Sequence, residues 1–170
     1  AFFGVYYKLQ TFIYMPTSGI VQGMRPLMSY NYGAKLKERM HQILKVSGLV
    51  IAAILGAGTL LFFIVPNVLL SLFNASSGML EIGETGLRIL SLSFIVSSFG
   101  VLMSGVFEAL GLGKYSLIVS LLRQLLITVP LAYILLNIMG IEGIWLSFVI
   151  AEAIASIVAY ILYHKKFKTI

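Results

Sequence analysis

Two stretches of the chain, residues 46–65 and 89–107, contain no charged side chain. Each approaches the roughly 20 apolar residues that a helix needs to cross a bilayer core of about 30 Å. Two such runs in one small soluble domain would be very unusual. Charged residues make up 11% of the chain, whereas soluble domains average about 25%. With a mean hydropathy of +1.00, the sequence therefore predicts an all-α integral membrane protein.

Five segments are expected to cross the membrane as a helical bundle. All five should be α-helical, because an open sheet edge would leave backbone groups unpaired in lipid. The runs do not alternate apolar and polar residues, which argues against a β-barrel. Their expected bounds are residues 4–30, 40–65, 84–110, 115–138 and 143–163. A basic tail at residues 164–170 follows the last segment, and the first segment is polar for a membrane helix.

Basic residues concentrate in alternate connections between these segments. The connection at residues 32–45 holds four Lys and Arg residues, the turn before the fourth segment holds Lys114, and the tail holds three lysines. The connections at 66–87 and 137–143 hold none. The positive-inside rule then places the basic connections and the C-terminus in the cytoplasm. We expect a multi-pass protein of the plasma membrane. Its net charge of +6 is explained by basic residues at the edges of the lipid bilayer and not by nucleic-acid binding.

The sequence offers no catalytic or metal-binding constellation. It has no cysteine, and its two histidines lie beside basic residues at expected helix ends. No Ser/His/Asp set, pair of catalytic carboxylates or nucleotide-binding fingerprint is present. We therefore expect no enzyme activity, no cofactor and no metal site.

Polar side chains recur every three or four residues along the first segment, so they share one helical face. They are Tyr7, Thr11, Tyr14, Ser18, Gln22, Arg25 and Ser29, with Lys8 beside the upper part of this stripe. Such a face must avoid lipid, so it either packs against partner helices or lines a water-filled cavity. Pro16 and Pro26 interrupt the segment, as either a static kink or a moving element.

Glu152 lies about 13 Å along its helix from Gly143, near the middle of the bilayer. An intramembrane carboxylate is either a proton- or ion-coupling group or one half of a structural ion pair. Arg123 is a candidate for its partner, although an arginine at that depth can also snorkel inward. Glu108, near the inner end of the third segment, is expected to form an interfacial salt bridge with Lys114.

Four stretches, in order, resemble the multidrug and toxic compound extrusion (MATE) family. The first is PTSGIVQGMRPLMSYNYGAKLKERM at residues 16–40, with its proline, Q-G pair, N-x-G-A motif and basic run. The others are GVFEALGLGKYSLIVSLLRQLLITVPLAYIL at residues 105–135, GIEGIWLSFVIAE at residues 140–152, and the basic tail. The resemblance covers nearly the whole chain. It implies helices eight through twelve of a twelve-helix protein, most of the C-terminal six-helix lobe, with the N-terminal lobe missing from this chain.

The resemblance implies a cation-coupled antiporter for multidrug (xenobiotic) efflux, which exchanges bulky, often cationic organic compounds for H⁺ or Na⁺. The substrate cavity would lie between the lobes and open alternately to each side. Its C-lobe wall would include Tyr7, Lys8, Thr11, Tyr14, Ser18, Gln22, Ser97 and Met103. Some family members place an ion-coupling carboxylate midway along the tenth helix, but residues 89–107 contain no acid. That departure argues against sodium coupling of this kind here.

Two other functions are alternatives to a multidrug exporter. A lipid-linked oligosaccharide flippase shares the two-lobe plan, and it predicts a strongly basic central cavity for a pyrophosphate. Only Lys8, Arg25 and Arg123 are available for such a cavity. A non-transporting structural membrane subunit is the third interpretation, and it predicts no polar stripe facing a cavity.

Overall fold

The computed structural model describes residues 2–73 and 76–167, and all regular structure in these ranges is helical. Residues 168–170 of the expected basic tail lie outside the described residues. The elements are α1 (Phe2–Gly33), α2 (Lys37–Ile64), α3 (Pro66–Ser71), α4 (Ser77–Ala109), α5 (Gly113–Leu121), a π-helical turn η1 (Leu122–Leu126), α6 (Thr128–Met139) and α7 (Ile141–Phe167). The predicted all-α fold is confirmed.

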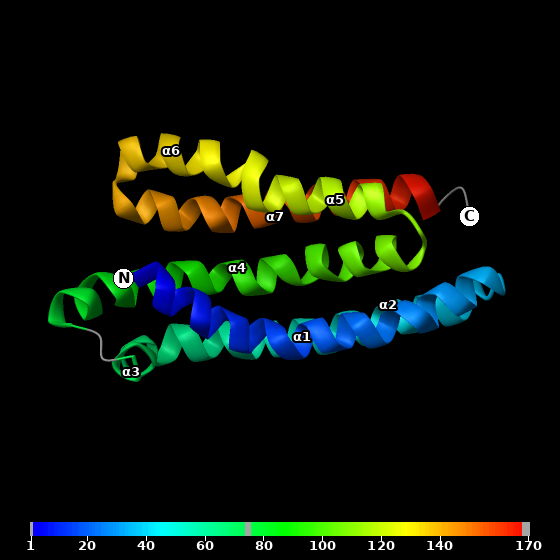
Figure 1. Ribbon diagram of the computed structural model, residues 1–170, viewed down its shortest axis with the longest axis horizontal. Helices are drawn as coiled ribbons and strands as arrows, with labels where there is room; N and C mark the ends of the chain where they lie inside the picture. Colours follow the sequence, from blue (N-terminus) through cyan, green and yellow to red (C-terminus); the bar gives the residue numbers. More distant parts are fainter. Residues whose placement is uncertain (1, 74–75, 168–170) are drawn as a thin grey trace.

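The long helices run side by side (Figure 1). Helix α4 lies between α1 and α2 on one side and α7 and α5 on the other, and α6 packs against α7. The turns that join α1 to α2 and α4 to α5 lie at the same end of the bundle as the C-terminus. The basic connections therefore share one end, as five alternating crossings require. The side of the membrane that this end faces stays a prediction.

Four stretches within the described residues have the length and hydropathy of a membrane span. They are Lys37–Ile64, Ser77–Ala109, Gly113–Met139 and Ile141–Lys166. Helix α1 is not among them, because its polar stripe lowers its hydropathy. It nevertheless runs along α2 and α4 in the same bundle (Figure 1). The fifth predicted crossing is thus present as a helix whose polar face distinguishes it from the other four.

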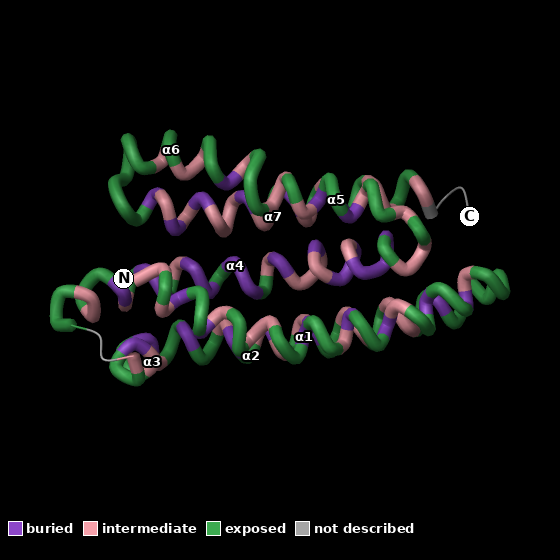
Figure 2. Tube along the Cα trace, in the orientation of Figure 1, coloured by how far each residue is buried: buried purple, intermediate pink, exposed green. Residues whose placement is uncertain are grey.

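The core of the bundle forms around α4. Leu87, Leu90, Phe94, Val106 and Phe107 of this helix are fully buried. Figure 2 shows buried positions concentrated on α4, whereas α6 is mostly exposed. In a membrane protein, exposed apolar residues of this kind are suited to lipid, so α4 is the central helix and α6 the peripheral one.

Small and hydroxyl residues let other helices approach α4 closely. A Cβ built on Gly105 would lie 2.5 Å from Val21 Cγ1 of α1. Thr59 of α2 donates a hydrogen bond of 2.9 Å to the Ser91 carbonyl, and Ser156 of α7 donates one of 3.0 Å to the Val96 carbonyl. Since lipid tails are as apolar as leucine, close backbone packing and interhelical hydrogen bonds replace the hydrophobic effect in holding these helices together.

Two helix ends depend on glycines in the left-handed region. Gly111, just beyond α4, has φ 71°, and Gly140, between α6 and α7, has φ 70°. Glycine adopts this conformation without the penalty that a Cβ imposes, which permits the tight turns. Pro66 starts α3 at its first position, where its missing N–H costs no helical hydrogen bond. The local sequence therefore explains where these helices stop and start.

One expected boundary differs from the structure, and the first helix continues past its two prolines. Helix α4 begins at Ser77, well before the expected residue 84. Glu84 and Arg88 form an ion pair of 2.8 Å one turn apart on this helix, and Asn67 donates to Glu84. The charges of Glu84 and Arg88 are thus paired on the helix, and residues 77–83 extend the helix ahead of them. Helix α1 is continuous through Pro16 and Pro26, although Figure 1 shows its first turns at an angle to the rest.

The contact between α1 and α4 gives a test of this packing. We expect Gly105→Ala to lower the free energy of unfolding by about 1–3 kcal/mol, because the new methyl group overpacks against Val21. Gly23→Ala is the matched control, because nothing lies within 4 Å of a Cβ at Gly23. Thermal unfolding of the detergent-purified protein measures both variants. Equal unfolding temperatures for the two would contradict the packing described here.

Candidate functional site

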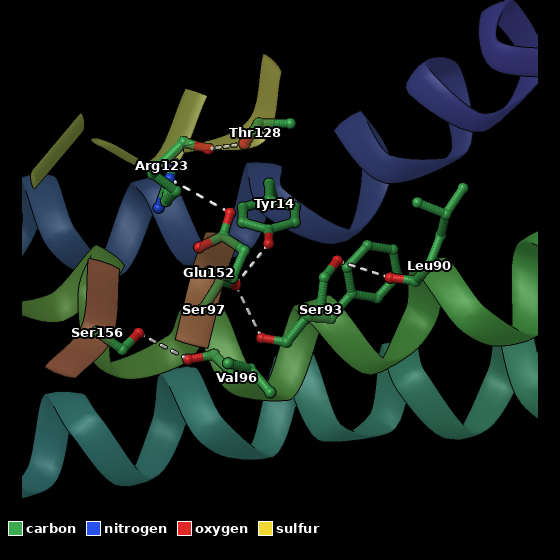
Figure 3. A network of polar contacts seen from close by, with 10 residues as sticks. Tyr14, Leu90, Ser93, Val96, Ser97, Arg123, Thr128, Glu152 and Ser156 are labelled. Carbon is green, nitrogen blue, oxygen red and sulfur yellow. Dashed lines mark hydrogen bonds and ion pairs between the residues drawn. The ribbon is translucent and has the colours of Figure 1, made fainter. Parts of the chain in front are cut away.

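An ion pair joins two helices deep inside the bundle. Arg123 Nε lies 3.3 Å from Glu152 Oε1, and the two side chains are only 20% and 15% exposed. Glu152 lies about 16 Å along α7 from the helix start at Ile141, so both charges sit near the middle of a bilayer core of about 30 Å. Figure 3 shows the pair with its neighbours. The ion pair that the sequence offered as one explanation for Glu152 is therefore present.

The π-helical turn η1 places Arg123 in this pair. The Ile127 N–H bonds to the Leu122 carbonyl, five residues back, and the Thr128 hydroxyl donates to the Arg123 carbonyl at 2.6 Å. Pro130 has no N–H with which to bond the carbonyl four residues earlier, which weakens the α-helical ladder at this point. Single-turn π-bulges of this kind occur frequently at functional sites.

A second polar contact lies beside the ion pair. The Tyr14 hydroxyl is 2.6 Å from Ser97 Oγ, and the Ser97 hydroxyl donates to the Phe94 carbonyl at 2.9 Å. Since that carbonyl can only accept, Tyr14 is the donor to Ser97. Glu152 lies close enough for its charge to act on Tyr14 (Figure 3). The Tyr14–Ser97 contact therefore joins α1 to α4 beside the ion pair of α7.

One oxygen of Glu152 has no partner. Its Oε2 is buried and accepts no hydrogen bond from any described residue. A buried carboxylate oxygen without a donor is unusual, because native structures pair almost all such groups. The arrangement leaves one oxygen of the carboxylate held by Arg123 and the other able to take up a proton or a cation.

Two hollows follow the polar stripe of α1. A hollow of about 450 Å³ is lined by Gln10, Thr11, Tyr14, Met15, Ser18, Gly19 and Gln22. A smaller one of about 210 Å³ shares Ser18 and Gln22 with it and extends to Arg25, Glu108 and Arg123. Pro26 adds to the polarity of this surface, because it has no N–H to bond the Gln22 carbonyl one turn earlier. The structure therefore brings Thr11, Tyr14, Ser18 and Gln22 together on hollowed surface.

Four other residues expected on the cavity wall do not line either hollow. Tyr7 and Lys8 are exposed on α1 but line neither hollow, and Lys8 Nζ lies 6.0 Å from the centroid of the Phe73 ring. Ser97 is fully buried, and its hydroxyl contacts the polar stripe of α1 through the Tyr14 hydroxyl. Met103 is buried in the core and lines a separate groove between α2 and α4.

Glu108 has a different partner from the one expected. It forms an ion pair with Arg25 of α1 and accepts a hydrogen bond of 2.8 Å from Ser116 of α5, while Lys114 lies over the Tyr115 ring. The expected pairing with Lys114 is wrong, because the turn at Gly111 directs Lys114 to the Tyr115 ring although it lies only six residues from Glu108 in the sequence. Helical spacing predicts the observed pair better. Glu108 follows Gly105 by three residues and Arg25 follows Val21 by four, so each charge lies about one turn beyond the contact between the two helices. The Gly105–Val21 contact therefore brings the two charges together.

The fold and this site define a multi-pass helical membrane protein with a polar surface on one side of its bundle. The MatE family model matches residues 1–134, and the chain belongs to this family. The multidrug export protein MepA of Staphylococcus saprophyticus is 26% identical over 95% of this chain. MepA of Staphylococcus aureus strain N315 is 25% identical over the same share. The chain spans 36% of the length of these curated relatives.

Solved structures share the same arrangement of helices. The MATE multidrug transporter DinF-BH has a TM-score of 0.86 and 31% identity over 96% of this chain and 36% of its own. A MOP superfamily transporter from Pyrococcus furiosus has a TM-score of 0.91 at 22% identity, over 99% of this chain and 38% of its own. The second likeness concerns the fold alone. The membrane-transporter fold and family that the sequence predicted are confirmed.

The ion pair allows a double-mutant test of its energetics. Arg123→Gln should destabilise the protein by about 3 kcal/mol, because it leaves the Glu152 charge buried without a partner. Glu152→Gln should cost less, since Arg123 borders the smaller hollow and can reach water there. The double variant should recover most of the loss in thermal unfolding of the detergent-purified protein. Strictly additive single losses would show that the two groups do not interact.

Proposed function

We propose that the chain forms helices of the C-terminal lobe of a cation-coupled exporter of bulky, often cationic organic compounds. The stripe of α1 would form one wall of the substrate cavity, and the missing N-terminal lobe would supply the opposite wall. The names of the MepA and DinF-BH relatives support multidrug export. The distribution of basic residues supports a plasma membrane location with a cytoplasmic C-terminus.

The observation that carries this proposal is the polar, uncovered face of α1. Thr11, Ser18 and Gln22 remain exposed within the described part of the chain. Polar groups do not face lipid at membrane depth without a large penalty, so this face requires either water or another protein surface. The hollow of about 450 Å³ beside it falls in the size range of small-molecule sites.

The chemistry of the same hollow suits flat organic cations. Tyr14 offers an aromatic ring for cation–π contact, and Met15 offers a polarisable, adaptable apolar surface. Gln10, Thr11, Ser18 and Gln22 supply neutral hydrogen-bonding groups around them. A site of this composition recognises shape and charge loosely, which is what export of many different compounds requires.

The two alternative functions receive less support. A flippase for a pyrophosphate-linked lipid needs unpaired cations in its cavity, but Arg25 is paired with Glu108 and Arg123 with Glu152. A structural subunit would have no need of a polar face that no described helix covers. Both interpretations therefore account for fewer of the described contacts than an exporter does.

Glu152 is the candidate coupling group within this chain. A proton or Na⁺ on its unpartnered oxygen would cancel the negative charge that holds Arg123. The contact between η1 and α7 would then weaken, and the balance between two arrangements of these helices would shift. Coupling in this form needs only that the ion binds one arrangement more tightly than the other.

Transport by the full-length protein tests the cavity. Cells that express it should expel the flat cation ethidium, and Ser18→Leu or Gln22→Leu should weaken efflux about tenfold, equal to about 1.4 kcal/mol. Ala57→Leu is the matched control, because it adds the same side chain at an exposed position of α2. An equal loss in all three variants, or no efflux by a well-expressed wild-type protein, would contradict the proposal.

Coupling is tested separately in vesicles with an imposed proton or sodium gradient. Wild-type uptake of ethidium into inside-out vesicles should depend on one of the two gradients. Glu152→Gln cannot exchange a proton and lacks the charge that attracts Na⁺, so its remaining uptake should no longer respond to that gradient. If Glu152→Gln transport follows the gradient as the wild type does, the coupling group lies elsewhere in the protein.

A further inference from the structure

A groove unrelated to the polar stripe lies between α2 and α4. Its volume is about 570 Å³. One face of α2 forms one side of it, through residues that recur at three- and four-residue spacing, among them Lys45, Gly48 and Ala52. The opposite side belongs to the second half of α4 and includes Phe99 and Leu102. The transport proposal uses none of these residues, and Met103, which the family resemblance implied for the substrate cavity, lies at the buried floor of this groove.

Small side chains create this groove. A Cβ on Gly48 would lie 3.0 Å from Leu102 Cδ2, so α2 and α4 approach closely there. Ala52, one turn further along, has too short a side chain to fill the space beside Phe99. Leu49, which forms part of the rim, is 62% exposed. The space therefore opens toward the outside of the described bundle.

The two ends of the groove differ in chemistry. His41, Gln42 and Lys45 line the end near the start of α2. Beyond Lys45 the lining is apolar apart from Ser98, whose hydroxyl is already bonded to the Ile95 carbonyl. Lys45 is also the last charged residue before the uncharged run at residues 46–65. It therefore marks the boundary between the membrane interface and the hydrocarbon core.

The dimensions match one leaflet of a bilayer. From His41 to Ala52 the groove extends about 16 Å along α2, close to half of a hydrocarbon core of about 30 Å. Lys45 is exposed and forms no ion pair with any described residue. An amphipathic molecule with one anionic end and one apolar chain would satisfy both ends at once.

We propose that this groove is a binding site for one anionic phospholipid. The phosphate lies against the Lys45 ammonium and the Gln42 amide, and one acyl chain follows Gly48, Leu49 and Ala52 toward Phe99. Basic pockets between membrane helices recognise anionic headgroups in this way, through charge at the interface and apolar contact below it. A free anion would gain nothing from the apolar part of the groove. This inference does not depend on what the protein transports.

Native mass spectrometry of the full-length protein in detergent tests the site. Phosphatidylglycerol and phosphatidylcholine with identical acyl chains are added in turn, and the fraction of protein that retains each is measured. Phosphatidylglycerol should be retained about fivefold more strongly, the advantage expected from one lysine near an anionic headgroup. Lys45→Gln should remove that preference. Inorganic phosphate, which has no acyl chain, should not displace the lipid.

Two further variants keep the result decisive. Arg39→Gln removes another exposed cation of α2 that does not line the groove, and it should leave retention unchanged. Ala52→Leu fills the apolar part and should reduce retention of both lipids, while a single symmetric gel-filtration peak confirms folding. If Arg39→Gln and Lys45→Gln lowered phosphatidylglycerol retention equally, general surface charge and not this groove would explain the binding. Equal retention of both lipids by the wild type, or of neither, would overturn the proposal.

Discussion

Close approach to α4 is the constraint on which the rest of the structure depends. Gly105 admits α1, the Thr59 hydroxyl ties α2 to the Ser91 carbonyl, and Ser156 ties α7 to the Val96 carbonyl. Lipid supplies no hydrophobic drive for helices to associate, so small residues and interhelical hydrogen bonds carry this packing. Because α1 and α2 pack on one side of α4 and α7 packs on the other, these contacts also fix which face of each neighbouring helix remains uncovered.

The candidate site follows from that arrangement. Once α1 is held against Gly105, its residues Val21 and Met24 face α4, while Ser18 and Gln22 are left on the uncovered side. The same contact brings Arg25 to Glu108. The apolar packing of one face thus determines the position of the polar face, and a polar face at membrane depth must meet water or protein. The function proposed here rests on this coupling between packing and polarity.

Much of the fold could be predicted from the sequence, because long uncharged runs and basic turns obey bilayer physics directly. The stripe of α1 and the candidate pairing of Glu152 with Arg123 also followed from helical spacing and depth. Other features depend on contacts that no local pattern encodes. Helix α4 starts at Ser77 without a side-chain capping hydrogen bond, and the π-helical turn accompanies a hydrogen bond from Thr128 to the Arg123 carbonyl. The burial of Met103 depends on how α2 packs against α4.

The segment of α5, η1 and α6 (residues 113–139) forms polar contacts with the rest of the bundle that converge on one region. Ser116 of α5 donates to Glu108, and Arg123 of η1 pairs with Glu152. Glu108 also holds Arg25 of α1, and the hollow of about 210 Å³ is lined by Arg25, Glu108 and Arg123 together. A change in charge at either carboxylate would therefore alter the polar contacts of this segment with α1 and α7. Helix α6, although mostly exposed, packs closely along α7, where Gly143 lies against the Leu135 carbonyl, so such a change would act on the polar contacts of α5 and η1 and not on the packing of α6.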